Sequence, residues 1–256
     1  DVHVKVDTGM GRLGVPTGRA ITLIERIRRL KGIRLQGLYT HYSSVEDDAE
    51  FSAFQRRQFQ ELAQQLDKTG IAIPLLHSNN SGAVLHEPES RFNLIRPGLL
   101  VYGIVPPGRR ETDSELSQRL RPALSLHCRV SLVKRIDKGT PLSYGRTFIA
   151  PKRMRVATLT AGYADGYLRA GSDRAEVLIQ GRRCRILGRI TMDQMLADVS
   201  HVSRTAPGDE VTLLGAQAQE KISLTQVAQW CGTIPWEILT NITCRVPRLY
   251  RGARAA

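Results

Sequence analysis

The stretch DVHVKVDTGMGRLG at residues 1–14 decides the fold that this sequence predicts. Its valines alternate with polar residues, and this period of two predicts a strand. Glycines follow the strand and allow the backbone to turn sharply beside a ligand. Lys5, Asp7 and Arg12 place charges at or just beyond the end of the strand, where parallel α/β folds bind ligands. Taken alone, the stretch fits a charged surface turn equally well.

Length and composition predict a folded protein of one or two domains, because the chain has 256 residues and 41% of them are hydrophobic. The strand pattern starts at the first residue, so we expect the sequence to begin within a fold. No apolar run approaches the ~20 residues that span a membrane. The four cysteines are far apart and form no CxxC pair. We therefore expect free thiols, no metal and a cytoplasmic location.

A net charge of +13 brings nucleic acid into consideration as a partner. The basic residues are scattered in short pairs, however, and aromatic residues make up only 5% of the chain. This aromatic content is low for a protein that binds nucleic acid by stacking its side chains on bases. We expect a basic surface that attracts an anionic small molecule, and neither a nucleic-acid nor a membrane partner.

The first hundred residues alternate between strand and helix patterns. Helices are predicted at 17–30 and 51–66, and strands at 35–41, 73–77 and 92–95. This alternation predicts a parallel sheet or a barrel. The apolar residues of the longer helix are expected to form its buried stripe: Phe51, Phe54, Phe59, Leu62 and Leu66.

The alternation of strand and helix patterns ends at 106–120. This stretch contains two prolines, and we interpret it as a linker or surface helix between domains. Beyond it, short strand-like runs separated by glycines predict an antiparallel β domain with a helix near 224–230. The runs are 124–136, 155–160, 176–179, 183–190, 195–199 and 210–214. The expected domains are 1–115 and 116–256.

Several polar residues come just after predicted strands, and this recurrence predicts a ligand site. They are Arg12, His41, Asn80-Ser81 and Arg96-Pro97-Gly98. Ser81 and the backbone near Gly98 and Leu99 could hold a phosphate, or the asparagine and serine could simply cap a helix.

Other candidates also have ordinary structural explanations. Arg96 is either a surface cation or a donor to an acceptor that must stay unprotonated, since arginine keeps its proton. His41 could be structural, and Tyr144 and Tyr163 lie in glycine-flanked turns where tyrosines usually anchor packing. Local motifs alone therefore predict an α/β-plus-β protein that binds an anionic small molecule.

The ordered combination of motifs is more specific. In chain order these are KVDTGMGRLG at 5–14, TH at 40–41, NS at 80–81, RPG at 96–98, YG at 102–103 and 144–145, GYADGY at 162–167, GRITMDQ at 188–194 and RVPR at 245–248. The set closely resembles bacterial alanine racemase, nearly from end to end. The resemblance implies a homodimeric isomerase that depends on pyridoxal phosphate and supplies D-alanine for the cell wall. It also implies part of a (β/α)8 TIM barrel, comprising its later strands, followed by a mainly antiparallel β domain.

The resemblance assigns roles around the cofactor. Arg96 resembles the arginine that hydrogen-bonds the pyridine nitrogen, and this would leave the ring nitrogen neutral and limit side reactions. The phosphate would lie against Asn80, Ser81, Gly98 and Leu99. Tyr144 resembles the second catalytic base, supplied to the partner's site, with His41 and Arg96 as its supports.

The resemblance also assigns the substrate's surroundings. Arg12 and the Met192 backbone would bind the carboxylate, with Asp193 beside them and Lys5 as a neighbouring group that can be carbamylated in the family. The residues expected to line the entryway are Tyr163, Arg169 and Arg189.

One required residue has no match, since racemisation needs a base on each face of Cα. Besides Tyr144, the other base should be the lysine that carries the cofactor, and its early-barrel motif does not occur in this sequence. We therefore expect this chain alone to be inactive. Two departures accompany this: Thr191 stands where cysteine is frequent, and Cys244 where an aromatic is expected. The alternatives are a serine racemase-like domain of a longer protein, or a non-catalytic cofactor-binding or dimerisation module.

Overall fold

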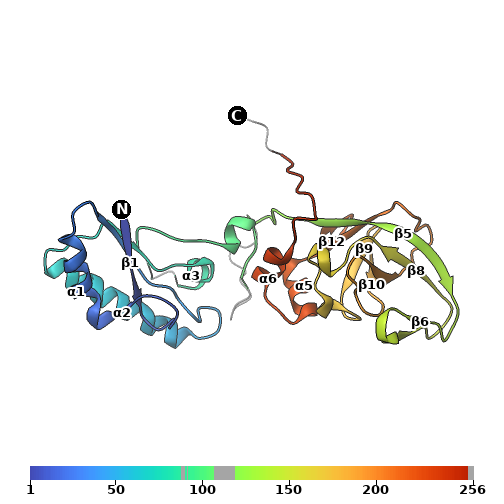
Figure 1. Cartoon of the computed structure of the whole chain (residues 1–256), viewed down its shortest axis with the longest axis horizontal. Coiled ribbons are helices and arrows are strands. Elements are labelled where there is room, and N and C mark those ends of the chain that lie inside the picture. The colour runs from blue at the N-terminus through green and yellow to red at the C-terminus, as the bar shows by residue number, and fades with distance from the viewer. Residues whose placement is uncertain (88–89, 91, 107–118, 253–256) are drawn as a thin grey trace. The chain divides into compact units, whose positions relative to one another are not determined.

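The computed structural model describes residues 1–87, 90, 92–106 and 119–252, and most of the predicted linker at 106–120 lies outside them. The chain divides into two compact units, Asp1–Arg121 and Pro122–Ala256. Each unit has its own sheet (Figure 1), and the two are described separately.

The first unit contains a four-stranded sheet in the order β2-β1-β3-β4, with every pair parallel. Its elements are β1 (Val2–Asp7), β2 (Val15–Pro16), α1 (Thr17–Arg28), β3 (Leu35–Tyr39), α2 (Ala49–Lys68), β4 (Leu75–His77), α3 (Ser81–His86) and a 3₁₀ turn at Leu99–Tyr102. The expected alternation of strands and helices is confirmed. Because all strands run the same way, their carboxyl ends meet at one edge.

Helix α2 shows why the first unit folds around its sheet. The Asp48 side chain caps it by accepting a hydrogen bond from the Phe51 N–H at 2.9 Å. Phe59, Leu62 and Leu66 are almost fully buried and pack with Val4, Val6, Leu38 and Ile24 in one core. Figure 1 shows α1 and α2 beside β1.

The predicted buried stripe of α2 was wrong at one position. Phe54 is 41% exposed, whereas Ser52 and Gln55 are fully buried. A helix turns about 100° per residue, so the face that carries Phe59 and Leu62 also carries residue 55 and not residue 54. Polar side chains therefore lie on a face that was expected to be wholly apolar.

The strand predicted at 92–95 was also wrong, since residues 92–95 have no strand conformation. Asn93 contacts β4 through its side chain instead. Its carboxamide donates to the Pro74 carbonyl at 2.6 Å and accepts from the Leu76 N–H at 2.8 Å. Phe92 still packs inward, edge-on to Phe59 at 5.0 Å between ring centroids. The segment thus buries its aromatic ring without a backbone ladder.

The second unit is built on an antiparallel sheet in the order β10-β9-β12-β5-β8-β11, with β13 paired to β12. This confirms the predicted antiparallel β domain. Its longer elements are β5 (Leu126–Ile136), β8 (Met154–Leu159), β9 (Glu176–Ile179), β10 (Arg182–Arg185), β11 (Met195–Asp198), β12 (Glu210–Gln217), β13 (Glu220–Ile222), α5 (Leu224–Cys231) and α6 (Pro235–Asn241). A small hairpin joins β6 (Pro141–Leu142) and β7 (Phe148–Ile149). Helix α6, which begins with a proline at its first position, was not predicted from the sequence.

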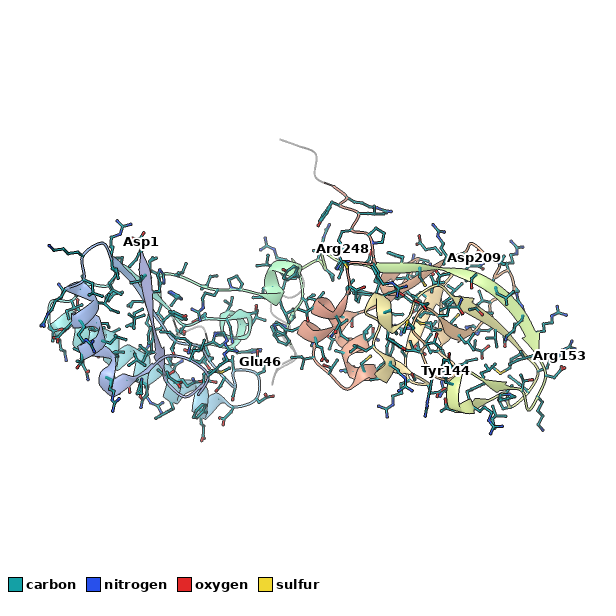
Figure 2. All side chains as sticks on the ribbon, viewed as in Figure 1. Asp1, Glu46, Tyr144, Arg153, Asp209 and Arg248 are labelled. Atoms are coloured by element: carbon teal, nitrogen blue, oxygen red, sulfur yellow. The ribbon has the colours of Figure 1, made fainter. Side chains whose placement is uncertain are left out.

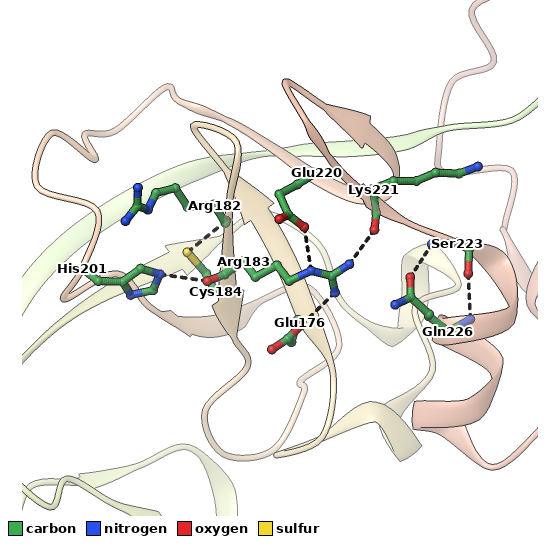
Figure 3. A network of polar contacts seen from close by, with 9 residues as sticks. All are labelled: Glu176, Arg182, Arg183, Cys184, His201, Glu220, Lys221, Ser223 and Gln226. Atoms are coloured by element: carbon green, nitrogen blue, oxygen red, sulfur yellow. Dashed lines mark hydrogen bonds and ion pairs between the residues drawn. The ribbon is translucent and has the colours of Figure 1, made fainter.

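An arginine ties the strands β9, β10 and β13 together (Figure 3). Arg183 pairs with Glu176 at 2.9 Å and with Glu220 at 2.8 Å, and it donates to the Lys221 carbonyl at 2.6 Å. These carboxylates raise the pKa of Arg183. Next to this cluster, α5 begins with a capping box between Ser223 and Gln226.

Two features are absent from the described ranges, which exclude 88–89, 91, 107–118 and 253–256. No helix there is long and apolar enough to cross a membrane. No cluster of His, Cys, Asp and Glu side chains there is arranged to hold a metal ion.

Candidate active site

The loop after β1 is organised by the carboxylate of Asp7. Asp7 accepts hydrogen bonds from the N–H groups of Gly9 at 3.0 Å and Gly11 at 3.1 Å, and these bonds lower its pKa. Both glycines have positive φ, 132° and 71°, a conformation that disfavours other residues. A side chain at Gly9 would also collide with the Phe51 ring. The loop is thereby held close to α2 and presents Arg12 to solvent.

Arg96 lies at the centre of the edge where the parallel strands end. Its Nη2 donates to the carbonyl oxygens of Thr40 at 2.7 Å and Ser78 at 3.2 Å, the residues that follow β3 and β4. Its Nη1 lies 2.5 Å from Nδ1 of His77, and its guanidinium carbon lies 5.1 Å from the centroid of the Tyr39 ring. Arg96 therefore joins two strand ends, and burial lowers its pKa without removing its proton.

The contact with Arg96 fixes the proton positions on two histidines. Arginine can only donate, so Nδ1 of His77 accepts and its proton is on Nε2. Nε2 lies 2.8 Å from Nδ1 of His3, which is then the next acceptor. Burial and the charge of Arg96 lower the pKa of His77 to about 4, so His77 is neutral at pH 7.

His41 is surrounded by positive charge. Its Nδ1 lies 3.4 Å from Nη2 of Arg96. Burial and the charges of Arg96, Arg12 and Lys5 lower the pKa of His41 to about 4. Lys5 donates to the Leu13 carbonyl, and burial, Arg12 and Arg96 outweigh Asp7 to lower the pKa of Lys5. The predicted residues Lys5, Arg12 and Arg96 therefore form one cationic edge around His41, whose ring is neutral at pH 7.

Ser81 lies in a cradle formed by the backbone of residues 98–100. Its Oγ accepts from the N–H of Gly98 at 2.7 Å and of Leu100 at 3.4 Å, which leaves the hydroxyl hydrogen free to donate. Asn80 caps α3 by accepting from the Ala83 N–H at 2.9 Å, so the capping alternative applies to this residue. Leu100 contributes the second N–H to Ser81, and the predicted Leu99 beside it in the chain is buried.

Glu46 approaches the same helix end. A side chain at Gly82 would meet the Glu46 carboxylate, which would then have to move. An acidic group at this position competes with any anion that the cradle attracts. Figure 2 labels Glu46 in the first unit. No role was predicted for Glu46 from the sequence.

In the second unit, a tight turn presents Met192 and Asp193. The Thr191 N–H and hydroxyl both donate to the Gln194 carbonyl, at 2.9 and 2.8 Å. The Met192 carbonyl accepts from the Ala164 N–H at 3.0 Å, and a side chain at Gly162 would collide with the backbone of this turn. Met192 is 52% exposed. The turn is thus rigid while its outer face remains open.

The end of this turn carries an ion-pair cluster. Arg245, from the RVPR motif, pairs with Asp193 at 2.7 Å and lies 3.5 Å from Asp165. Asp165 also accepts from the Gly162 N–H at 2.9 Å. Two motifs that are distant in sequence, GYADGY and RVPR, therefore stabilise the 191–194 turn together.

Tyr144 projects from the surface of the second unit (Figure 2) and is 70% exposed. Its backbone neighbourhood is strained, since Ser143 and Arg146 have φ of 58° and 50°. Ser143 Oγ donates to the Arg189 carbonyl at 2.5 Å, and the Arg189 guanidinium lies against Gly145. Tyr144 and Arg189 are thus neighbours, while Tyr163 and Arg169 are exposed on separate 3₁₀ turns.

These features define a class of protein. Its first unit is an α/β fold with a cluster of cationic side chains at the ends of parallel strands, and its second is an antiparallel β domain. The family follows from comparison with known proteins. The family described as "Alanine racemase, N-terminal domain" matches residues 1–106, and "Alanine racemase, C-terminal domain" matches residues 123–250. The chain belongs to the alanine racemase family, which uses pyridoxal phosphate.

Individual relatives agree with this assignment. Alanine racemase of Carboxydothermus hydrogenoformans is 43% identical over 249 residues, covering 97% of this chain and 67% of that protein. Alanine racemase of Geobacter sulfurreducens is 39% identical over 254 residues, covering 97% of this chain and 65% of that protein.

Solved structures agree as well. The crystal structure of alanine racemase from Streptomyces lavendulae has a TM-score of 0.88 at 33% identity, and it covers 98% of this chain and 66% of that chain. The structure from Bacillus anthracis with bound L-Ala-P has a TM-score of 0.84 at 34% identity, covering 98% and 64%. This chain therefore spans about two thirds of the length of its relatives, and its first unit is part of a (β/α)8 barrel.

Proposed function

We propose that this chain provides the later barrel strands and the β domain of a pyridoxal-phosphate-dependent alanine racemase. The observation that carries the proposal is Arg96, a permanent hydrogen-bond donor held at the strand ends by the Thr40 and Ser78 carbonyls. Its Nε–H has no acceptor among the residues that the structure describes. Arg96 can therefore donate to an acceptor on a ligand.

The residues present fit the cofactor. Bound pyridoxal phosphate supplies an electron sink that makes the α-proton of an amino acid acidic. Arg96 would donate to the pyridine nitrogen and, because arginine keeps its proton, leave that nitrogen neutral. This weakens the electron sink and favours return of the proton to Cα over competing reactions.

The Ser81 cradle would hold the phosphate. The hydroxyl of Ser81 is free to donate because its oxygen already accepts from Gly98 and Leu100. The neighbouring charges of Arg96 and Arg12 favour a dianion at this edge. Glu46 must move aside or be protonated for an anion to approach Gly82 closely.

Arg12 of the first unit is proposed to bind a substrate carboxylate, and the outer face of the 191–194 turn is proposed as a separate carboxylate-binding element. The Met192 N–H has no backbone acceptor among the described residues, and Asp193 is held by Arg245. Lys5 would lie beside the carboxylate, and its lowered pKa increases the neutral amine that carbamylation requires. Tyr163, Arg169 and Arg189 would line the entryway.

Tyr144 would act as one of two bases on opposite faces of Cα, supplied to the site of a partner subunit. Its 70% exposure on the second unit supports a role outside its own domain. His41 and Arg96 would support it electrostatically. The other base would be the lysine that carries the cofactor, for which this chain has no matching motif. The chain alone is therefore proposed to be inactive.

The test joins this chain to the remaining third of the Carboxydothermus hydrogenoformans relative and assays racemisation of alanine and serine. We expect stoichiometric pyridoxal phosphate and turnover of alanine, with the intact relative as control. Preferential turnover of serine would instead establish the serine racemase alternative. Cofactor binding without turnover would indicate a non-catalytic module, and absence of cofactor binding would refute the proposal.

A further inference from the structure

Gln55 is an uncharged polar side chain buried on the core-facing side of α2. It is 0% exposed, and the same helix face carries Phe59, Leu62 and Leu66. Burying a carboxamide is unfavourable unless all of its polar atoms find partners. A leucine would pack at such a position without that cost, so the amide needs an explanation.

All four hydrogen-bonding positions of the Gln55 carboxamide are used. Its Nε2 donates to Thr8 Oγ1 at 3.3 Å and to the His41 carbonyl at 3.2 Å. Its Oε1 accepts from the Ser43 N–H at 3.0 Å and from Ser43 Oγ at 3.2 Å. This is the full capacity of a glutamine side chain.

These partners lie in the two loops that form the cationic edge. Thr8 directly follows β1, while His41 and Ser43 lie in the loop after β3. The two loops are also joined by a bond of 2.7 Å between the Thr8 and Thr40 hydroxyls. The Thr40 carbonyl in turn accepts from Arg96 at 2.7 Å. The chain of contacts therefore runs from α2 to Arg96.

We propose that Gln55 is a positioning residue that fixes the backbone of His41 and, through Thr8 and Thr40, the guanidinium of Arg96. It touches neither substrate nor cofactor. The inference rests on the proposed function, because it assigns Gln55 to the same site. It concerns the geometry of His41, however, and that can be measured without cofactor or turnover.

The pKa of His41 reports its position. Arg96, Arg12 and Lys5 face the ring, and together with burial they hold its pKa at about 4. If the 40–43 segment loosens, the ring becomes hydrated and moves away from these charges. Its pKa then rises toward 6.5.

The experiment is an NMR titration of the histidines in the 256-residue chain, comparing Gln55→Met with Gln58→Met. Gln58 lies on the same helix and contacts Thr17 at 3.3 Å, away from both loops. We expect Gln55→Met to raise the pKa of His41 by about one unit or more and Gln58→Met to leave it unchanged. An unchanged His41 pKa in folded Gln55→Met would overturn the proposal.

A second variant covers the case in which Gln55→Met fails to fold. Thr8→Val is isosteric and removes only the acceptor for the amide and the link to Thr40. It should raise the pKa of His41 by about half a unit, and no shift would contradict the proposal. Absence of racemisation in the joined protein would refute the proposed function and leave both titrations interpretable.

Discussion

His77→Gln is the substitution that most sharply separates the electrostatics of this edge from its packing. His77 is 4% exposed and stacks on Tyr39, with ring centroids 4.9 Å apart. It accepts from Arg96 and can donate to His3, and a glutamine carboxamide can do both. The substitution therefore retains hydrogen bonding while removing the titratable group.

The magnitude follows from the pKa of His77, which falls from 6.5 to about 4 on folding. Between these values the unfolded chain binds more protons than the folded one, so stability falls as pH falls below 6.5. At pH 5 the free energy of unfolding is therefore lower than at neutral pH by about 2 kcal/mol, and below about pH 4 it falls no further through this group. The pKa of His41 is also lowered, but this side chain is only half-buried, so it contributes less to the pH dependence of stability.

The assay is urea unfolding of both proteins at pH 7.5 and pH 5, followed by circular dichroism and by tryptophan fluorescence. Both tryptophans, Trp230 and Trp236, lie in the second unit, so fluorescence reports a region without His77. Between pH 7.5 and pH 5, the free energy of unfolding of the first unit should fall by about 2 kcal/mol more in the wild type than in His77→Gln. The unfolding of this unit is seen by circular dichroism but not by tryptophan fluorescence. Equal pH dependence of the two proteins would refute the reasoning, as would titration of His77 near 6.5.

Three further outcomes are expected. Arg183→Gln should lower the free energy of unfolding of the second unit by only about 1 kcal/mol, because its ion pairs are partly exposed. As a control, the exposed neighbour Arg182→Gln should change this free energy by less than about 0.5 kcal/mol. Equal effects of the two substitutions would contradict the role of the cluster in Figure 3. Asn93→Ala should lower the free energy of unfolding of the first unit by about 1 kcal/mol, because it removes the two hydrogen bonds that the carboxamide makes to the Pro74 carbonyl and the Leu76 N–H. An unchanged midpoint in urea unfolding would contradict this prediction. In a titration with pyridoxal phosphate, Ser81→Ala should weaken binding about tenfold and Glu46→Gln should strengthen it. Tighter binding by Ser81→Ala than by Glu46→Gln would exclude this cradle as the phosphate site.

Periodicity in the sequence was sufficient for the fold class, because the main elements contain several turns or alternations each. The helix predicted at 51–66 is present at Ala49–Lys68, and the short strand-like runs after residue 124 form the antiparallel sheet. The error at 92–95 arose where a single side chain replaced a regular pattern. Asn93 contacts β4 with its carboxamide, so an apolar run that resembles a strand forms none.

The candidate site was only partly predictable. His41 and Ser81 were found because each comes shortly after a strand, and the same rule could have found His77, the last residue of β4. Arg96 was found by the same rule from the strand expected at 92–95, although no strand is present there. Gln55 could not be found this way. Its importance comes from contacts with residues 12 to 47 positions away in the sequence, which only the packing of α2 against the loops brings together.

The most direct test of the two-base account is deuterium incorporation at Cα, measured separately from L-alanine and from D-alanine. It uses the protein joined to the remaining third of its relative, with and without Tyr144→Phe. If Tyr144 is one of two bases on opposite faces of Cα, its loss should abolish exchange from one enantiomer and leave exchange from the other largely intact. Equal loss from both enantiomers, or unchanged exchange from both, would contradict the account.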